Sequence, residues 1–143
     1  MKHVEIFTDG SCWPNPGGRG GYGVIVTYNE HFKEFSGGYY PTTNNRMEMM
    51  AAIVGLEALK EPCQVTLYSD SQYLIKTMNR QFRRGANKDL WNRMDKAVGQ
   101  HKVKWVWVRG HNGHAENERC DRLASDAMHS KDLLKDEGYG SKR

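Results

Sequence analysis

The hydrophobic period of the chain changes once, at Pro41, and this change constrains the fold more than any other feature. Before Pro41, apolar and polar residues alternate over residues 2–12, 22–28 and 32–40, with turn-rich segments between them. After Pro41, apolar residues recur every three or four positions from Met47 to Leu59, which predicts a helix that ends by Pro62. The first half of the chain therefore predicts a three-strand antiparallel meander followed by a helix.

The second half of the chain alternates short strands with helices. Its pattern predicts strands at 65–69 and 103–108, and helices at 71–79, at 89–100 and from about Glu116. Such alternation favours parallel strands joined by crossovers, so the fold class is α/β. The length of 143 residues fits a single domain over residues 1–143, with a loose polar tail at residues 129–143.

Composition narrows the classes of protein that the chain can belong to. No apolar run approaches the roughly 20 residues that cross a bilayer, and the first residues do not resemble a signal peptide, so we expect a soluble, cytoplasmic protein. The three cysteines are Cys12, Cys63 and Cys120. An odd count without CxxC spacing supports neither a disulfide framework nor a zinc ribbon, and the cysteines are expected to be reduced thiols.

The positive charge of the chain is concentrated in one segment. Lys and Arg exceed Asp and Glu by 21 − 17 = +4, and residues 74–88 alone contribute +5, which leaves −1 for the rest. A basic segment on a near-neutral body suggests contact with a polyanion such as a nucleic acid. A solvated helix face is the commoner explanation of a charge run, so this segment alone leaves the question open. The five basic residues are Lys76, Arg80, Arg83, Arg84 and Lys88.

Four carboxylates lie where predicted elements begin or end. Asp9 and Asp70 come near the ends of predicted strands, and Glu48 and Asp121 lie early in predicted helices. Each one alone is explained by a turn, a helix cap or the helix dipole. If the strand before Asp70 docks beside the first strand, all four can face one crevice at the carboxyl ends of the strands. Buried carboxylates need compensation, and oxygen ligands of this kind suit Mg²⁺ or Mn²⁺.

The sequence around these four carboxylates resembles one known family. The blocks IFTDGSC at 6–12, TTNNRME at 42–48, SDSQY at 69–73 and GHNGHAENERCD at 110–121 are similar to the signature blocks of type 1 ribonuclease H, bacterial branch. WVWV at 105–108 and EGY at 137–139 extend the resemblance over nearly the whole chain. The resemblance implies a ribonuclease H-like fold, a five-stranded mixed sheet flanked by helices. It also implies endonucleolytic cutting of the RNA strand of RNA/DNA hybrids, which leaves 5′-phosphate and 3′-hydroxyl ends.

The resemblance also implies a role for individual residues. Asp9, Glu48, Asp70 and Asp121 match the acids that hold two Mg²⁺ ions, for which Mn²⁺ can substitute, and Asp9 would bridge both ions. His111 matches an auxiliary histidine that shuttles a proton or helps product and metal to leave. Glu118 matches a further acid of the site. The residues that match substrate contacts are Cys12, Asn15, Thr43, Asn44, Asn45 and Gln72. Of these, Asn15 and Thr43 lie where a phosphate of the DNA strand would be bound. For Asn44 and Asn45, helix capping is the alternative.

The chain departs from the bacterial pattern in its basic segment. Many bacterial members carry a long basic protrusion with tryptophans and lysines, whereas here only residues 74–88 separate SDSQY from the DLW motif at 89–91. Arg83, Arg84 and Lys88 are expected to keep part of the electrostatic role of the protrusion. We therefore expect weaker and more salt-sensitive binding of hybrids than in relatives with the long protrusion.

Two other functions compete with a hybrid-specific nuclease. One is another nuclease of the same fold, such as a resolvase or an integrase-like enzyme that acts on DNA. The other is a module that binds hybrids without cutting them, but a pure binder gains nothing from four carboxylates that face phosphate. The expected enzyme is a freestanding monomer without an obligate protein partner, and a domain of a reverse transcriptase is the alternative.

Overall fold

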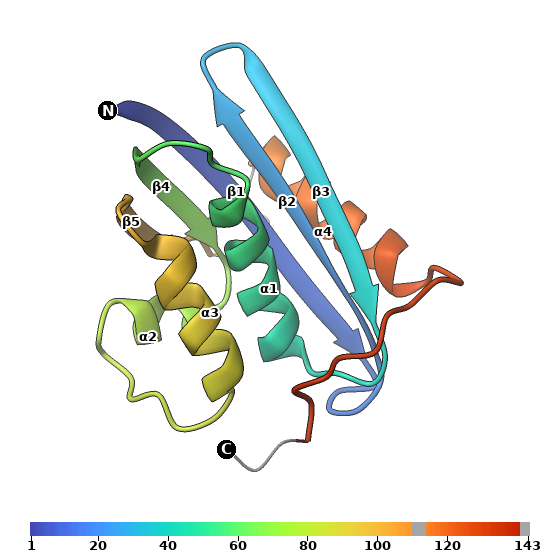
Figure 1. The fold of residues 1–143 in the computed structure, drawn as a ribbon. Helices are drawn as coiled ribbons and strands as arrows, with labels where there is room; N and C mark the ends of the chain where they lie inside the picture. Colours follow the sequence, from blue (N-terminus) through green and yellow to red (C-terminus); the bar gives the residue numbers. More distant parts are fainter. Residues whose placement is uncertain (110–113, 141–143) are drawn as a thin grey trace.

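A five-stranded sheet with the strand order β3-β2-β1-β4-β5 forms the centre of the protein in the computed structural model, which describes residues 1–109 and 114–140 (Figure 1). β1 pairs antiparallel with β2, and β2 pairs antiparallel with β3. β1 and β5 each pair parallel with β4. The predicted meander with two added parallel strands is thus confirmed. The elements are β1 (Lys2–Trp13), β2 (Arg19–Tyr28), β3 (His31–Tyr39), α1 (Asn44–Glu57), β4 (Cys63–Ser69), α2 (Gln72–Met78), α3 (Lys88–Val98), β5 (Lys102–Trp107) and α4 (Ala115–Met128).

Several elements differ in their bounds from the sequence prediction, β2 and α1 among them. β2 begins at Arg19, three residues earlier than predicted, because Gly20 and Gly21 pair with Cys12 and Ser11 of β1 and continue the ladder. α1 ends at Glu57, before the predicted stop at Pro62, and Ala58 closes its last turn. The hydrophobic pattern alone marks neither the start of β2 nor the end of α1.

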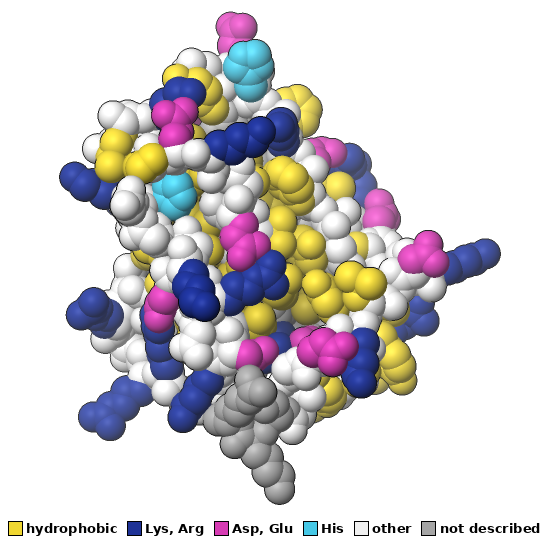
Figure 2. Space-filling view, viewed as in Figure 1, with side chains coloured by type: hydrophobic (Ala, Val, Ile, Leu, Met, Phe, Trp, Pro, Cys, Tyr) yellow, Lys and Arg dark blue, Asp and Glu magenta, His cyan; other side chains and the backbone are white. Residues whose placement is uncertain are grey.

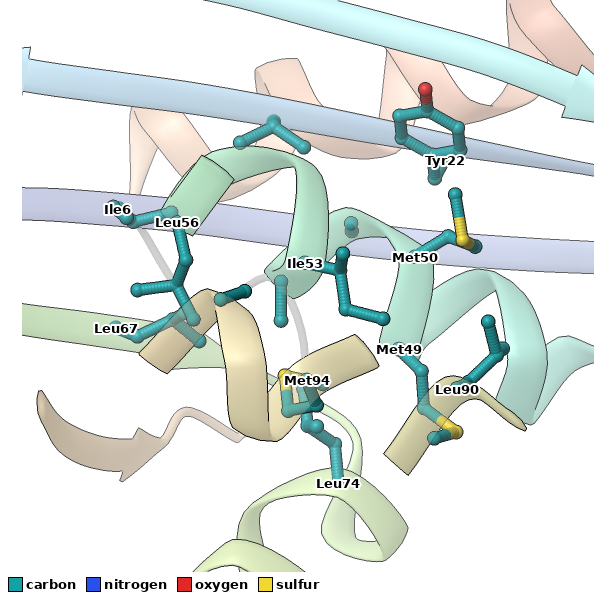
Figure 3. Packing of buried hydrophobic residues seen from close by; sticks show 14 of the residues in the cluster. Ile6, Tyr22, Met49, Met50, Ile53, Leu56, Leu67, Leu74, Leu90 and Met94 are labelled. Carbon is teal, nitrogen blue, oxygen red and sulfur yellow. The ribbon is translucent and has the colours of Figure 1, made fainter. Parts of the chain in front are cut away.

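Helices cover both faces of the sheet. α1 lies against one face with α3 and α2 outside it, and α4 lies on the opposite face (Figure 1). α1 is buried between the sheet and these helices: Leu74 and Met94 gather beside Ile53 of α1 (Figure 3). On the other face, Phe7 and Ile25 of the sheet pack on Cys120 of α4. Because β1 is covered on both faces, the chain around Asp9 is shielded from water.

The C-terminal tail, predicted to be loose, makes contacts with the body of the protein at residues 134–136. The backbone of Leu134 forms a bridge with Tyr39, at the end of β3. The Asp136 carboxylate accepts hydrogen bonds from Arg46 and Thr42. In Figure 1 the tail runs from α4 around the end of β3 to the side that carries α1 and α3. The tail was predicted to be loose because it is polar, but one of its polar residues, Asp136, binds it to the body of the protein.

Among the described residues, no helix combines the length and the apolar composition that crossing a bilayer requires.

Candidate active site

Asp9 and Asp70 lie side by side because of the register between two parallel strands. The last paired residues of β1 and β4 are Phe7 and Tyr68, and each aspartate follows two positions later. Asp9 remains within β1, where it pairs with Gly23 of β2, so it is not part of a turn. Each aspartate thus lies near the carboxyl end of its strand. Because the two strands are adjacent and parallel, both carboxylates come to the same edge of the sheet.

Glu48 reaches the same place from the first turns of α1. It is 4% exposed, as is Asp9. Gly10 allows α1 to lie directly on β1 here, since a Cβ atom at position 10 would be 2.5 Å from the backbone nitrogen of Glu48. The position of Glu48 relative to Asp9 therefore depends on a glycine in the strand.

Gly10→Ala is expected to push α1 away from β1 and to move Glu48 away from Asp9. We expect a loss of about 2–3 kcal/mol in the free energy of unfolding, because the added methyl group meets backbone that has no room to yield. The affinity for any divalent cation that these acids bind should fall by about tenfold. Urea unfolding and isothermal titration with Mg²⁺ measure the two effects. Gly85→Ala is the control, since a Cβ atom there meets no atom within 4 Å; equal effects of the two substitutions would contradict the prediction.

The carboxylates form one open pocket with Asp121 of α4. Oxygen atoms of Asp9, Glu48 and Asp70 all lie within 4.8 Å of one another. Asp121 lines the same pocket, whose volume is about 420 Å³. The structure thus brings together all four acids that the sequence predicted. The other lining residues are Gly10, Asn44, Asn45, Ser71, Gln72 and Tyr73.

Burial and nearby negative charges make Asp9 and Glu48 hard to ionise. Burial raises the pKa of Asp9 to about 8, and the negative charge of Asp70 and a hydrogen bond with Asp121 add to the effect. The pKa of Glu48 is also raised well above its ordinary value, first by burial and then by the charges of Asp9 and Asp70. Glu48 Oε1 is buried without a hydrogen-bond partner among the described residues. A bound dication would satisfy this oxygen and compensate the repulsion.

The N-caps of α1 and α2 are hydroxyl residues that adjoin Asn44 and Asp70 of the pocket. Ser71, rather than Asp70, is the N-cap of α2, and its hydroxyl accepts a hydrogen bond from the Leu74 amide. Thr43, rather than Asn44, is the N-cap of α1. The capping alternatives for Asp70 and Asn44 are therefore not what the structure contains.

Comparison with known proteins agrees with this geometry. The family model described as RNase H matches residues 1–129. The chain belongs to the ribonuclease H family. A ribonuclease H of Klebsiella pneumoniae is 56% identical over 152 aligned positions, and one of Aeromonas salmonicida is 49% identical over 154. The first alignment covers 97% of both proteins, and the second covers 97% of this chain and 98% of the relative. The protein is thus an enzyme of the ribonuclease H class and resembles the bacterial type 1 branch.

Solved structures show the same ribonuclease H fold. The chain aligns with LC9-RNase H1, a type 1 RNase H with the type 2 active-site motif, at a TM-score of 0.79 and 30% identity, over 90% of this chain and 72% of that one. It aligns with LC11-RNase H1 in complex with an RNA/DNA hybrid at a TM-score of 0.74 and 23% identity, over 87% of this chain and 96% of that one. The latter similarity supports the fold alone.

The residues that the ribonuclease H resemblance assigned to substrate lie in several environments. Thr43 lines a second pocket of about 210 Å³ together with Asn87 and Lys88. Asn15 is exposed on the loop before β2. Its side-chain oxygen accepts a hydrogen bond of 2.9 Å from the backbone amide of Asn44. This bond brings Asn15 to the start of α1, beside Thr43.

Two further predicted residues, Cys12 and Glu118, do not line the carboxylate pocket. Cys12 is buried, and its thiol donates to the carbonyl oxygens of Pro14 and Thr42. Glu118 is exposed on α4, three residues before Asp121, and does not line the pocket. His111 lies outside the described residues, so its role stays a prediction.

The shortened basic segment forms the connection between α2 and α3. Lys and Arg side chains are frequent over this connection, at the lower left of Figure 2. Arg83 and Lys88 are exposed. Arg84 is also exposed, but it pairs with Asp95, to which its two terminal nitrogens donate over 2.7 and 2.9 Å, and its guanidinium lies 5.1 Å from the Trp91 ring centroid. Arg84 therefore already has an acidic partner within the protein, in a pair that remains open to water.

Sequence reasoning missed two residues beside the predicted site. Arg46 is 3% exposed and joins α1 to α3 and to the tail. Asn87 lines the pocket of Thr43 and has a φ of 61°, in the left-handed region that asparagine tolerates. The Gly-Ala-Asn sequence before α3 was a signal for a turn at Asn87. No local pattern signals the partners of Arg46, because they lie 43 and 90 residues away.

Proposed function

We propose that the protein hydrolyses the RNA strand of RNA/DNA hybrids with two Mg²⁺ ions, for which Mn²⁺ can substitute, and leaves 5′-phosphate and 3′-hydroxyl ends. The observation that carries the proposal is the convergence of four acids from β1, α1, the end of β4 and α4 on one open pocket. Support comes from the curated ribonuclease H relatives and from the neighbour of the same fold in complex with a hybrid.

Metal binding follows from the donor set of the pocket. Asp9, Glu48 and Asp70 would share the first ion, since their oxygens are mutually within 4.8 Å, and Asp121 with Asp9 would complete the second position. Glu48 Oε1 lacks a hydrogen-bond partner among the described residues, and Asp9 has a raised pKa. Both observations fit carboxylates whose negative charge is balanced by a bound cation. When bound, the ions supply charge stabilisation for the attacking water and for the departing 3′ oxygen. No protein nucleophile is required.

Amide side chains around the acids are suited to recognise the RNA strand. Asn44, Asn45 and Gln72 line the pocket, and each amide both donates and accepts hydrogen bonds. Hybrids are read through 2′-hydroxyls and shape across a shallow minor groove, for which such groups are appropriate. The adjacent pocket of Thr43 and Lys88 would hold a phosphate of the DNA strand.

His111 is proposed to assist proton transfer or product release. The protein is further proposed to act as a cytoplasmic monomer.

A cleavage assay with labelled RNA/DNA hybrid, double-stranded DNA and double-stranded RNA, with and without Mg²⁺, tests the proposal. We expect Mg²⁺-dependent cutting of the RNA strand of the hybrid alone. End-labelling of the products identifies the 5′-phosphate. Cutting of double-stranded DNA would favour a DNA-directed nuclease, and tight binding without cutting would favour a binding module; either result contradicts the proposal.

Arg83→Ala is expected to weaken hybrid binding more than Arg84→Ala does. Both arginines are exposed, but Arg84 is paired with Asp95. Loss of one phosphate contact should raise KM about three- to tenfold at 200 mM salt and reduce its salt dependence. The measurement is KM and kcat for both variants at 50 and 200 mM salt. An unchanged KM for Arg83→Ala at both salt concentrations would remove the basic segment from the binding model.

A further inference from the structure

A buried arginine joins three distant segments of the chain. Arg46 of α1 donates to both carboxylate oxygens of Asp89 at the start of α3, over 2.9 and 2.7 Å. It also donates to both oxygens of Asp136 in the tail, over 2.7 and 2.9 Å. The side chain of Arg46 is 3% exposed and that of Asp136 is 9% exposed. Paired, two-point contacts of this kind fix both distance and orientation.

Asp136 also reaches the turn that leads into α1. The Thr42 hydroxyl donates to Asp136 Oδ2 over 2.6 Å, and Thr42 immediately precedes the N-cap Thr43. The tail passes closely over this network: a Cβ atom at Gly138 would overlap the Asp89 carboxylate and lie 2.5 Å from Arg46 Nη2. The tail is therefore packed on the ion pairs and is not merely near them.

The same network forms one wall of the pocket that contains Thr43. Arg46 Nη1 donates to the side-chain oxygen of Asn87 over 3.3 Å, and the Arg46 backbone amide donates to the Thr43 hydroxyl over 3.2 Å. Arg46, Asn87 and Thr43 all line this pocket, as do Gly138 and Tyr139 of the tail. A shift of Arg46 would thus displace both Thr43 and Asn87 in the lining of the pocket.

We infer that Asp136 is a positioning residue for substrate: through Arg46 it holds the start of α1 and the turn at Asn87 in the arrangement that binds a backbone phosphate of the duplex. This inference rests on the proposed function. Asp136 does not line the pocket of the four acids, so its effect should fall on substrate binding and spare bond breaking. The tail that follows the family match at residues 1–129 is then part of the substrate-binding apparatus.

Electrostatics and positioning make opposite predictions for Asp136→Asn. If Asp136 acted only through its charge, its neutralisation beside a phosphate site would strengthen binding of a polyanion. If Asp136 positions Arg46, its neutralisation weakens the ion pair, loosens the pocket and weakens binding. The sign of the change in KM therefore separates the two explanations.

The test compares Asp136→Asn and the milder Thr42→Val with wild type, at a temperature at which all are fully folded. Hybrid cleavage gives kcat and KM, and fluorescence anisotropy in Ca²⁺ gives Kd for the same duplex. We expect Asp136→Asn to raise KM and Kd about tenfold and Thr42→Val about threefold, with kcat changed less than threefold. Glu57→Gln is the matched control, because the exposed Arg93–Glu57 pair also joins α3 to α1, with distances of 2.9 and 2.8 Å, and lies outside the pocket of Thr43.

Unchanged or lowered KM and Kd in Asp136→Asn would overturn the inference, whatever happens to stability. An equal rise in Glu57→Gln would also overturn it, since the effect would then follow from helix packing in general. Absence of hybrid cleavage by the wild-type protein is a different result, which contradicts the proposed function.

Discussion

Replacing Asp9 with Asn is expected to abolish hybrid cleavage and, at the same time, to make the metal-free protein more stable at pH 8. Asp9 contributes to both proposed metal positions, so kcat should fall by at least about a thousandfold. The stability gain arises because the substitution removes a buried negative charge that Asp70 and Glu48 oppose. We expect a gain of about 1–3 kcal/mol in the free energy of unfolding without metal.

The gain in stability should depend on pH in a defined direction. The pKa of Asp9 is about 8 in the folded protein and near its ordinary value of 3.8 in the unfolded chain. Between these values the folded state holds a proton that the unfolded state has lost, so the stability of the wild type falls as pH rises from about 4 to 8. Asn does not titrate, so the advantage of Asp9→Asn should grow over this range.

Urea unfolding in EDTA at pH 5 and pH 8 measures this difference. Mg²⁺ should raise the stability of the wild type more at pH 8 than at pH 5, and should have little effect on Asp9→Asn. Asp126→Asn is the control, because Asp126 is an exposed acid on α4 outside the pocket. Residual cleavage by Asp9→Asn near the wild-type rate, or a stability gain that does not change with pH, would contradict the metal-site interpretation.

The fold and the four acids were predictable because their signals are local. Alternation and helical periodicity identified every strand and helix, and their order favoured parallel pairing in the second half of the chain. The docking of β4 beside β1, which brings Asp9 beside Asp70, was a condition of the predicted site and is seen in the structure. The change of period at Pro41 marked where the meander ends and α1 begins. Gly10 was part of a recognised motif, but its contact with the backbone at Glu48 depends on how closely α1 approaches β1, which the sequence does not give.

The ion pairs around the site were not predictable, because they join residues that the sequence does not show to be neighbours. Arg46 occurs in a polar stretch at the start of α1, where an exposed side chain would be the usual expectation. Its burial follows only once α3 and the tail meet over it. The polar composition of the tail predicted looseness, yet a polar tail that carries an acid opposite a buried arginine is fixed in place. Arg84 is a similar case, since its partner Asp95 lies on the next helix.

Replacing Arg46 with Met is expected to lower the free energy of unfolding by about 3–5 kcal/mol at pH 7. Met keeps much of the volume of the side chain but removes the cation between Asp89 and Asp136, which leaves two partly buried carboxylates without it. Arg93→Met removes the exposed pair with Glu57 on the same helices and should cost less than about 1 kcal/mol. Comparison of the two substitutions separates a buried ion network from an ordinary surface pair.

The cost of Arg46→Met should shrink in acid. Arg46 holds the pKa of Asp89 below its ordinary value through their hydrogen bonds, so this stabilisation is present above about pH 4 and is lost as pH falls through the lowered pKa. Without Arg46 the Asp89 carboxylate takes up a proton more readily, which removes its repulsion with Asp136 at low pH. Urea unfolding at pH 7 and pH 3 should therefore give a clearly smaller difference between variant and wild type at pH 3. A difference that is equal at both values would mean that lost packing, and not lost charge, is what the substitution removes.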